Sequence, residues 1–174
     1  MRRRQYLSAL SLATVAAAGC TGPGDSTETA APQAVSVNFS NESGRTMVFT
    51  AAVVADGLGG VRITYHDDSE TTYEDAESID DLPADAWDGA VSFTPLADHQ
   101  RRQFRSTDGS GIGIQFDPVG YGATVVTTVA DPNREDSMLS VGAGTCGEVD
   151  EAHVDVRVDA EGAVHLATTC ADDA

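Results

Sequence analysis

The chain has 174 residues, enough for one ordinary domain with additional terminal segments. Its ten basic residues are all arginine, its acidic residues number 28, and its net charge is −18. This acidity excludes a protein that binds nucleic acid by neutralising phosphates, because such proteins need a basic face. Hydrophobic residues make up 41% of the chain, which predicts a folded core rather than an acidic disordered tail.

The first 19 residues have the features of an export signal. A basic start is followed by a small, apolar run that is shorter than the ~20 residues of a membrane-spanning helix. The sequence RRQYL, which begins with Arg3 and Arg4, resembles the twin-arginine (Tat) export motif. Residues 17–20 (AAGC) resemble a lipobox, in which the cysteine is lipidated and becomes the first mature residue. We therefore predict a signal peptide over 1–19, lipidation at Cys20 and a location on the extracellular face of the cell membrane.

Removal of residues 1–19 leaves seven arginines against 28 acidic residues, a net charge of −21. Such a charge repels itself in dilute buffer, whereas at molar salt the Debye length falls to about 3 Å and the repulsion is screened. The acidic, lysine-free composition and the Tat-like, lipobox-bearing signal are together similar to those of haloarchaeal Tat-exported lipoproteins. The resemblance implies an envelope location in a salt-rich medium, and no functional motif comes with it.

Once Cys20 is assigned to lipid, Cys146 and Cys170 remain as a pair. Outside the cell we expect them to form a disulfide, and two buried free thiols are the alternative. Residues 20–33 are rich in Gly, Pro, Ser and Thr and show no apolar period, which predicts a flexible, lipid-anchored tether. Residues 34–174 are expected to form one domain.

Alternation of apolar and polar residues dominates the predicted domain. It predicts strands at 35–39, 46–55, 61–65, 91–93, 103–105, 112–116, 124–129 and 138–141, with a C-terminal hairpin of 154–158 and 164–166. The hairpin turn at 160–162 places Val156 opposite Leu166 and Val158 opposite Val164 on the inner face, and Arg157 opposite His165 on the outer face. The β-branched run 124–129 is typical of a central strand. About eight to ten short strands predict an all-β, immunoglobulin-like sandwich, and a small β-barrel is the alternative.

Residues 67–88 contain ten carboxylates and no base, and we expect a long acidic loop with one helical turn at 83–87. Its oxygen atoms could hold Ca²⁺ or another cation, but the usual D-x-D-x-D-G spacing is absent, and a solvated surface is the alternative. At its start, His66, Asp68 and Glu70 would project from one face of a continued strand, a ligand set that suits zinc or non-haem iron. A turn at 67–69 would separate them. No other cofactor is expected.

Three further patterns concern the surface. His153, Asp155, Arg157 and His165 are expected on the outer face of the hairpin as a cross-strand charge cluster. Asn38 and Asn41 each begin an N-x-S sequon, with Asn41 expected in the turn after the first strand, and both are candidate glycosylation sites. The glycine-rich stretch 109–113 matches neither a nucleophile elbow nor a phosphate-binding loop.

These patterns contain no nucleophile–base pair and no metal motif, so we do not expect an enzyme. The sequence favours a non-catalytic binding or interaction module of the cell envelope. It would hold membrane lipid through Cys20 and would meet an envelope protein through the sandwich edges or residues 67–88. The alternative is a cation- or small-solute-binding lipoprotein that serves a membrane transporter.

Overall fold

The computed structural model of the protein describes residues 33–133 and 139–172. The predicted signal peptide, Cys20 and residues 20–32 of the tether lie outside the described residues, as does Met138. Gln33, predicted as the last residue of the tether, is instead fully buried, and its Nε2 donates to the carbonyl oxygen of Val149. The described residues form eleven strands: β1 (Ala34–Asn41), β2 (Met47–Val54), β3 (Val61–Tyr65), β4 (Glu70–Tyr73), β5 (Ala90–Pro95), β6 (His99–Ser106), β7 (Ser110–Gln115), β8 (Thr124–Ala130), β9 (Ser140–Thr145), β10 (Glu151–Val158) and β11 (Val164–Ala171). Two 3₁₀ helices, η1 (Ile79–Asp81) and η2 (Ala84–Trp87), lie between β4 and β5.

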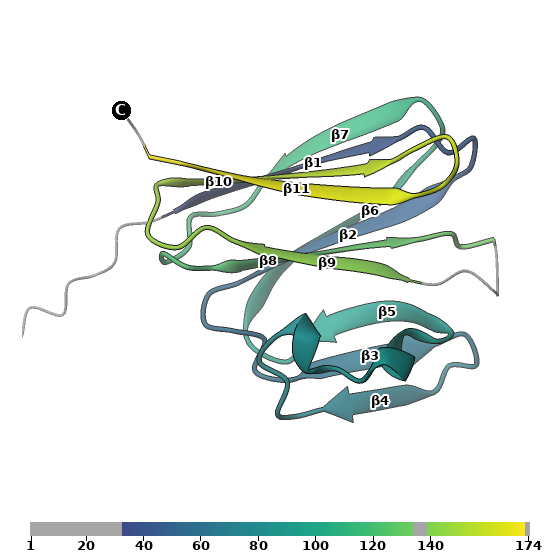
Figure 1. Cartoon of the computed structure of the whole chain (residues 1–174), viewed down its shortest axis with the longest axis horizontal. Coiled ribbons are helices and arrows are strands. Elements are labelled where there is room, and N and C mark those ends of the chain that lie inside the picture. The colour runs from purple at the N-terminus through teal and green to yellow at the C-terminus, as the bar shows by residue number, and fades with distance from the viewer. Residues whose placement is uncertain (1–32, 134–138, 173–174) are drawn as a thin grey trace, which may run out of the picture.

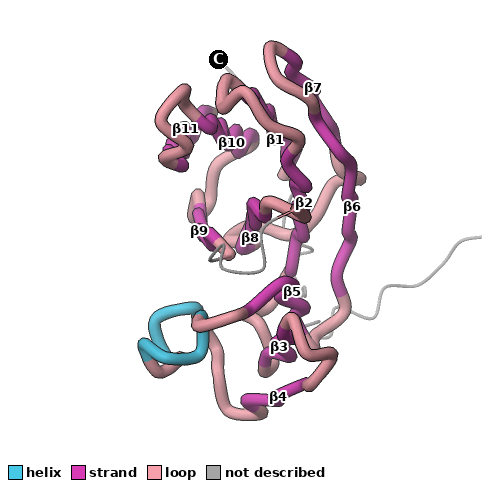
Figure 2. Tube along the Cα trace, turned by 90° about the vertical axis from the view of Figure 1, so that its right-hand side faces the viewer, coloured by secondary structure: helices cyan, strands magenta, loops and turns pink. Residues whose placement is uncertain are grey.

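The strands form three sheets that are stacked as layers (Figures 1 and 2). The upper sheet has the order β11-β10-β1-β7, the central sheet β6-β2-β8-β9 and the lower sheet β4-β3-β5. The upper and central sheets pack face to face through a shared core, so the predicted all-β sandwich is confirmed. All three sheets are open, and the alternative of a small closed barrel does not form.

The connection between the first two strands sets the topology. β1 and β2 lie in different sheets, and β1 pairs in parallel with β10 from the far end of the chain. In the immunoglobulin order the first two strands are neighbours in one sheet. The strand order therefore differs from that of the immunoglobulin fold. Alternation of side chains predicts which face of a strand is buried but not which strand lies beside it.

The central sheet is buried on both of its faces. Successive residues of a strand point to opposite faces, and in β2 Val53 faces the upper core while Val54 faces the lower core. Val125 and Val126 divide in the same way in β8. All four side chains are at most 2% exposed. The prediction of a central strand at 124–129 is therefore confirmed, and its nearly continuous β-branched sequence follows from burial on both sides.

The lower sheet and the two 3₁₀ helices cover the second face of the central sheet. Val61 and Phe93 from the sheet pack in the lower core with Leu82 and Ala86 from the helical segment. The single long acidic loop predicted at 67–88 is therefore wrong, because this segment contains β4, η1 and η2. The helical turn predicted at 83–87 is confirmed as η2. Carboxylates dominate the sequence pattern there, and a few apolar residues anchor the segment in the lower core.

The C-terminal hairpin has the predicted register, with Val156 opposite Leu166, Arg157 opposite His165 and Val158 opposite Val164. Gly162 in its turn has a φ of +86°, a conformation that favours glycine. Leu166 was expected on the inner face, yet it is 38% exposed. The reason is that β11 is an edge strand, so the central sheet covers it only in part.

Strands β9 and β11 close one side of the sandwich, although they belong to different sheets. A Cβ atom added at Gly142 would overlap the side chain of Leu166, and one added at Gly144 would overlap that of Thr168. Two residues further along both segments, Cys146 and Cys170 form the predicted disulfide, with their Cα atoms 5.4 Å apart. Positions 142, 144 and 146 thus face 166, 168 and 170, and the two glycines permit the approach that the disulfide completes.

Removing this disulfide is expected to destabilise the fold. The bond joins residues 24 positions apart. Without it the unfolded chain gains conformational entropy, which lowers the free energy of unfolding by about 3 kcal/mol. Guanidinium unfolding of the Cys146→Ser/Cys170→Ser variant, followed by the fluorescence of Trp87, measures the loss. Wild-type protein treated with a reductant should reproduce the variant. An unchanged unfolding midpoint in both samples would contradict the expectation.

Gly144→Ala should lower the free energy of unfolding by about 1–3 kcal/mol, because the added methyl group meets Thr168 in a closely packed edge. A second substitution, Thr168→Ala, removes the nearest atoms, so the double variant should regain most of the loss. The four proteins are compared by guanidinium unfolding. An equal cost of Gly144→Ala in both backgrounds would place the effect elsewhere.

Candidate functional site

The predicted metal ligands at the start of the acidic segment do not share a strand face. β3 ends at Tyr65 and β4 begins at Glu70, with a turn between them. His66 and Asp68 lie in this turn, where Asp68 has a φ of +62°. Within residues 33–133 and 139–172, no three His, Cys, Asp or Glu side chains are grouped as a metal ion would require. The continued strand that would align His66, Asp68 and Glu70 is therefore replaced by the turn.

Several carboxylates of residues 67–88 stabilise turns of their own segment. Oδ1 of Asp67 accepts hydrogen bonds from the hydroxyl and the backbone N–H of Ser69. Oδ2 of Asp81 accepts from the backbone N–H groups of Ser78 and Glu77 and from the hydroxyl of Ser78. These hydrogen bonds favour the charged form and hold the pKa of each aspartate below its ordinary value. Part of the acidic cluster thus has a structural role in these turns, which requires no bound cation.

The two sequons differ in accessibility. Asn38 is exposed on β1, and its Nδ2 donates to Oδ1 of Asp155 over 3.2 Å. Asn41, predicted in an exposed turn, is instead the last residue of β1 and only 1% exposed. Its Nδ2 donates to the carbonyl oxygens of Arg45 and Ser106, which ties the turn after β1 to the end of β6. The folded protein therefore leaves Asn38 as the accessible candidate for glycosylation.

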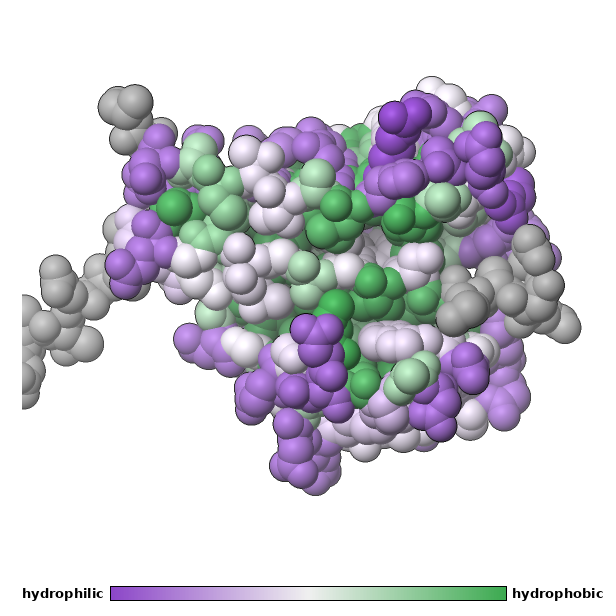
Figure 3. Space-filling model, in the orientation of Figure 1, coloured by the Kyte–Doolittle hydropathy of each residue, from purple (hydrophilic) through white to green (hydrophobic). Residues whose placement is uncertain are grey.

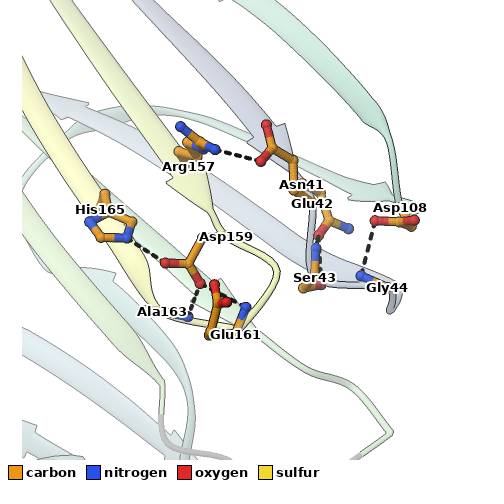
Figure 4. Close-up of polar contacts among 10 residues, drawn as sticks. All are labelled: Asn41, Glu42, Ser43, Gly44, Asp108, Arg157, Asp159, Glu161, Ala163 and His165. Carbon is orange, nitrogen blue, oxygen red and sulfur yellow. Dashed lines mark hydrogen bonds and ion pairs between the residues drawn. The ribbon is translucent and has the colours of Figure 1, made fainter.

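The predicted charge cluster on the hairpin is split into separate pairs, as Figure 4 shows for two of them. Arg157 pairs with Glu42 on the turn after β1, and not with His165 opposite it. Nε2 of His165 donates to Oδ2 of Asp159 over 2.7 Å. Oδ1 of the same aspartate accepts from the backbone N–H groups of two turn residues, so it acts as the cap of the hairpin turn. The third pair is His153 with Asp155, at 3.3 Å.

Strand β6 is a free edge of the central sheet. It pairs with β2 along its whole length, and no described strand pairs with its other side. Phe104 points inward from β6, with its ring centre 5.0 Å from that of Phe39 and 5.7 Å from that of Phe49. The strand is therefore anchored in the core at Phe104, while its outer rim presents backbone N–H and C=O groups that lack a strand partner.

Three exposed arginines lie on this strand: Arg101, Arg102 and Arg105, which we call the basic edge. Because side chains alternate along a strand, Arg101 and Arg105 project from one face of the central sheet and Arg102 from the other. Among the described residues, none of the three has a carboxylate oxygen within 4.0 Å of its guanidinium. The remaining described arginines do have such partners, in the pairs Arg45–Asp131 (3.0 Å), Arg62–Glu70 (4.0 Å) and Arg157–Glu42.

Hydrogen bonds tie one end of β6 to the segment that follows β7 and the other end to the first residue of β7. Nε2 of Gln100 donates to the carbonyl oxygen of Asp117, and the N–H of Asp117 donates to Oε1 of Gln100, each over 2.9 Å. At the other end, the hydroxyl oxygens of Ser106 and Ser110 lie 2.7 Å apart. Figure 2 shows β6 and β7 on one side of the molecule and β9 and β11 on the other. The arginines lie between the two ties.

On the opposite side of the molecule, β9 and β11 pack closely against each other. A groove of about 280 Å³ runs there, lined by Thr127, Val129, Ser140, Val141, Gly142, Val164 and Leu166. Figure 3 shows hydrophobic residues gathered near the middle of this face of the molecule. The disulfide and the contacts of Leu166 and Thr168 close this side, whereas side-chain hydrogen bonds hold the two ends of β6.

The arginines of the basic edge are not among the site residues predicted from the sequence, although a signal for them exists. Residues 100–105 read QRRQFR, so three of the seven arginines that follow the signal peptide lie within five positions. The net charge of the whole chain obscures this local excess of positive charge. The predicted strand at 103–105 is confirmed, but it is longer and occupies 99–106.

No protein-family model matches this chain, and neither does any curated protein sequence. Among solved structures, the T6SS lipoprotein TssJ1 from Pseudomonas aeruginosa is similar over 81% of this chain and 99% of its own, with 10% sequence identity and a TM-score of 0.43. The human-specific toxin intermedilysin is similar over 81% of this chain, with 7% identity and a TM-score of 0.37. The cytotoxin protein suilysin from Streptococcus suis is similar over 82%, with 8% identity and a TM-score of 0.38.

The chain spans 24% of the length of each of these two toxins. Similarities of this size concern the arrangement of strands and carry no information on function. In the described part of the chain, no helix is long and apolar enough to cross a membrane. The assignment of a function therefore depends on the residues of this chain.

The role of Asp159 as the cap of the hairpin turn predicts how the stability of the fold depends on pH. The hydrogen bond from His165, and next that from the N–H of Ala163, lower the pKa of Asp159 below its ordinary value of 3.8. A lowered pKa in the folded state stabilises the fold above that ordinary value, and the stabilisation is lost as the pH falls through the folded-state pKa. Asp159→Ala should therefore unfold at a lower temperature than the wild type at about pH 5, and the difference should close at more acidic pH.

Thermal unfolding followed by circular dichroism across this pH range measures the effect. The matched control is Glu161→Ala, which removes an exposed carboxylate from the same turn and should follow the wild-type profile. A difference between Asp159→Ala and wild type that stays constant with pH would contradict the role of the charged carboxylate.

Proposed function

We propose that this protein is a non-catalytic interaction module of the cell envelope, and that a partner protein docks on its basic edge. The observation that supports the proposal is the basic edge itself. On a chain with 28 acidic residues, Arg101, Arg102 and Arg105 lie together on a strand whose outer edge is unpaired. No described carboxylate oxygen lies within 4.0 Å of their guanidinium groups. An unpaired edge strand is a template for pairing with another chain, and complementary charge selects which chain binds.

A purely protective role for these arginines fits the rest of the chain less well. Charged residues do protect edge strands from accidental pairing. Elsewhere this protein places acidic residues at such an edge, because β4 begins with Glu70 and is followed directly by Glu74 and Asp75. Protection alone would therefore be served by the residue type that the chain already uses. The choice of arginine on β6 favours a partner that carries negative charge.

The proposal places the domain at the outer face of the cell membrane, held by a lipid on Cys20 after Tat-type export. The RRQYL motif and the lipobox-like AAGC sequence support this location. A disulfide between Cys146 and Cys170 suits an oxidising compartment. The tether of residues 20–32 would give the domain a reach of roughly 20 Å from its anchor. The acidic, lysine-free composition supports a salt-rich exterior of the haloarchaeal kind.

Co-purification from native membranes tests the docking site. Arg101→Gln/Arg105→Gln removes two charges from the basic edge, and Arg62→Gln/Arg157→Gln removes two exposed charges elsewhere. Full-length tagged proteins are crosslinked and extracted at molar salt. The wild type and the control pair should retain a stoichiometric partner, whereas the edge pair should lose most of it, because its arginines supply the complementary charge.

Thermal unfolding and membrane fractionation of both variants establish that they are folded and anchored. Equal partner recovery by the edge pair and the control pair would overturn the basic edge as the docking site. Recovery of the lipoprotein alone from wild-type membranes would overturn the interaction module.

A further inference from the structure

Strand β6 is suited to accept an additional strand. Peptides that bind by strand addition form hydrogen bonds with the backbone of a free edge and place alternate side chains on the two faces of the sheet. β6 has eight residues, a usual length for such pairing. About half of its backbone N–H and C=O groups are directed away from β2, because the bonding direction alternates along an antiparallel strand. The inward side chain of Phe104 holds the strand in place against the core.

The placement of the arginines fits a strand better than a flat surface. Arg101 and Arg105 lie on one face of the sheet and Arg102 on the other. An added strand also has side chains on both faces, so it can meet all three guanidinium groups at once, whereas a flat anionic surface contacts one face at a time. Between Arg101 and Arg105, Nε2 of Gln103 donates to Oγ1 of Thr50 over 3.1 Å and is held against β2. The two arginines therefore flank a side chain that is already engaged.

The chemistry of the partner follows from the arginines. A guanidinium group binds a carboxylate through two parallel hydrogen bonds, which favours direct contact between the groups. At molar salt, attraction beyond about 3 Å is screened, so only carboxylates in such contact contribute. We infer that the partner adds an extended acidic segment to β6 as a new strand of the central sheet, with carboxylates on both faces of that strand and β-forming residues between them. This inference rests on the proposed function and specifies the partner's chemistry.

Synthetic peptides with the length of β6 test the inference on the detergent-solubilised full-length protein. The probe carries glutamates at both odd and even positions, so that carboxylates lie on both faces of the added strand, with valine and threonine between them. One control replaces every glutamate by glutamine, and a second keeps the glutamates but carries N-methylated backbone amides, which cannot pair as a strand. Fluorescence anisotropy measures binding at low and at molar salt.

The acidic probe should bind the wild type and the Arg62→Gln/Arg157→Gln control equally well. Its affinity for Arg101→Gln/Arg105→Gln and for Arg102→Gln should be weaker by about tenfold or more. Both control peptides should show a loss of similar size. Hydrogen exchange supplies a second measurement, because amides within residues 99–106 should exchange more slowly when the acidic probe is bound.

Three results would overturn the inference. Equal binding of the N-methylated peptide would show that charge suffices without strand pairing. If no acidic peptide binds, yet the edge pair still loses its native partner, the inference fails and the proposed function stands. If the arginines instead govern binding to vesicles of anionic lipid, and no peptide binds, the basic edge contacts membrane, and both the inference and the proposed docking site fail.

Discussion

Burial of the central sheet on both faces is the constraint on which the rest of the structure depends. Val53 and Val54 are adjacent in β2, yet each is almost fully buried in a different core. A strand with apolar side chains on both faces is stable only when each face is covered, because exposed apolar surface is unfavourable in water. The upper sheet supplies one cover and the lower layer the other. With both faces occupied, the central sheet meets solvent chiefly at its edge strands, β6 and β9.

The two edge strands of the central sheet, β9 and β6, differ in how they are covered. At β9, glycines at 142 and 144 let β11 approach closely, and the disulfide fixes this approach covalently. At β6, the side chain of Phe104 enters the upper core, and hydrogen bonds of Gln100 and Ser106 tie the strand ends to β7 and the segment after it. One edge is thus closed by packing and the other is left open and charged. A surface that is firmly supported and incompletely paired is well suited to recognition, because binding need not order the strand first.

Charge is used in two ways on this molecule. Asp67, Asp81 and Asp159 accept hydrogen bonds from backbone N–H groups and hydroxyl or imidazole groups nearby, so part of the acidity stabilises turns. Arg45 and Arg157 are paired with carboxylates across the fold. The basic edge departs from both patterns, since its arginines are presented to solvent with no described acid beside them. In a salt-rich medium the large net charge is screened, and short-range contacts of this kind retain their specificity.

Four features follow from the sequence: the β-sandwich, the buried central strand at 124–129, the register of the hairpin and the Cys146–Cys170 disulfide. Local alternation and the turn geometry specify the faces and the register, and the cysteine pairing follows from the predicted lipidation of Cys20 and an oxidising exterior. Other features depend on contacts between distant segments, which the periodicity of apolar residues does not encode. They are the neighbours of each strand, the third layer over residues 67–88 and the burial of Asn41. The basic edge depends both on the local sequence and on the tertiary structure. QRRQFR is visible in the sequence, but only the tertiary structure decides that this strand lies at an open edge, because pairing and burial there are set by β2 and the core beneath it.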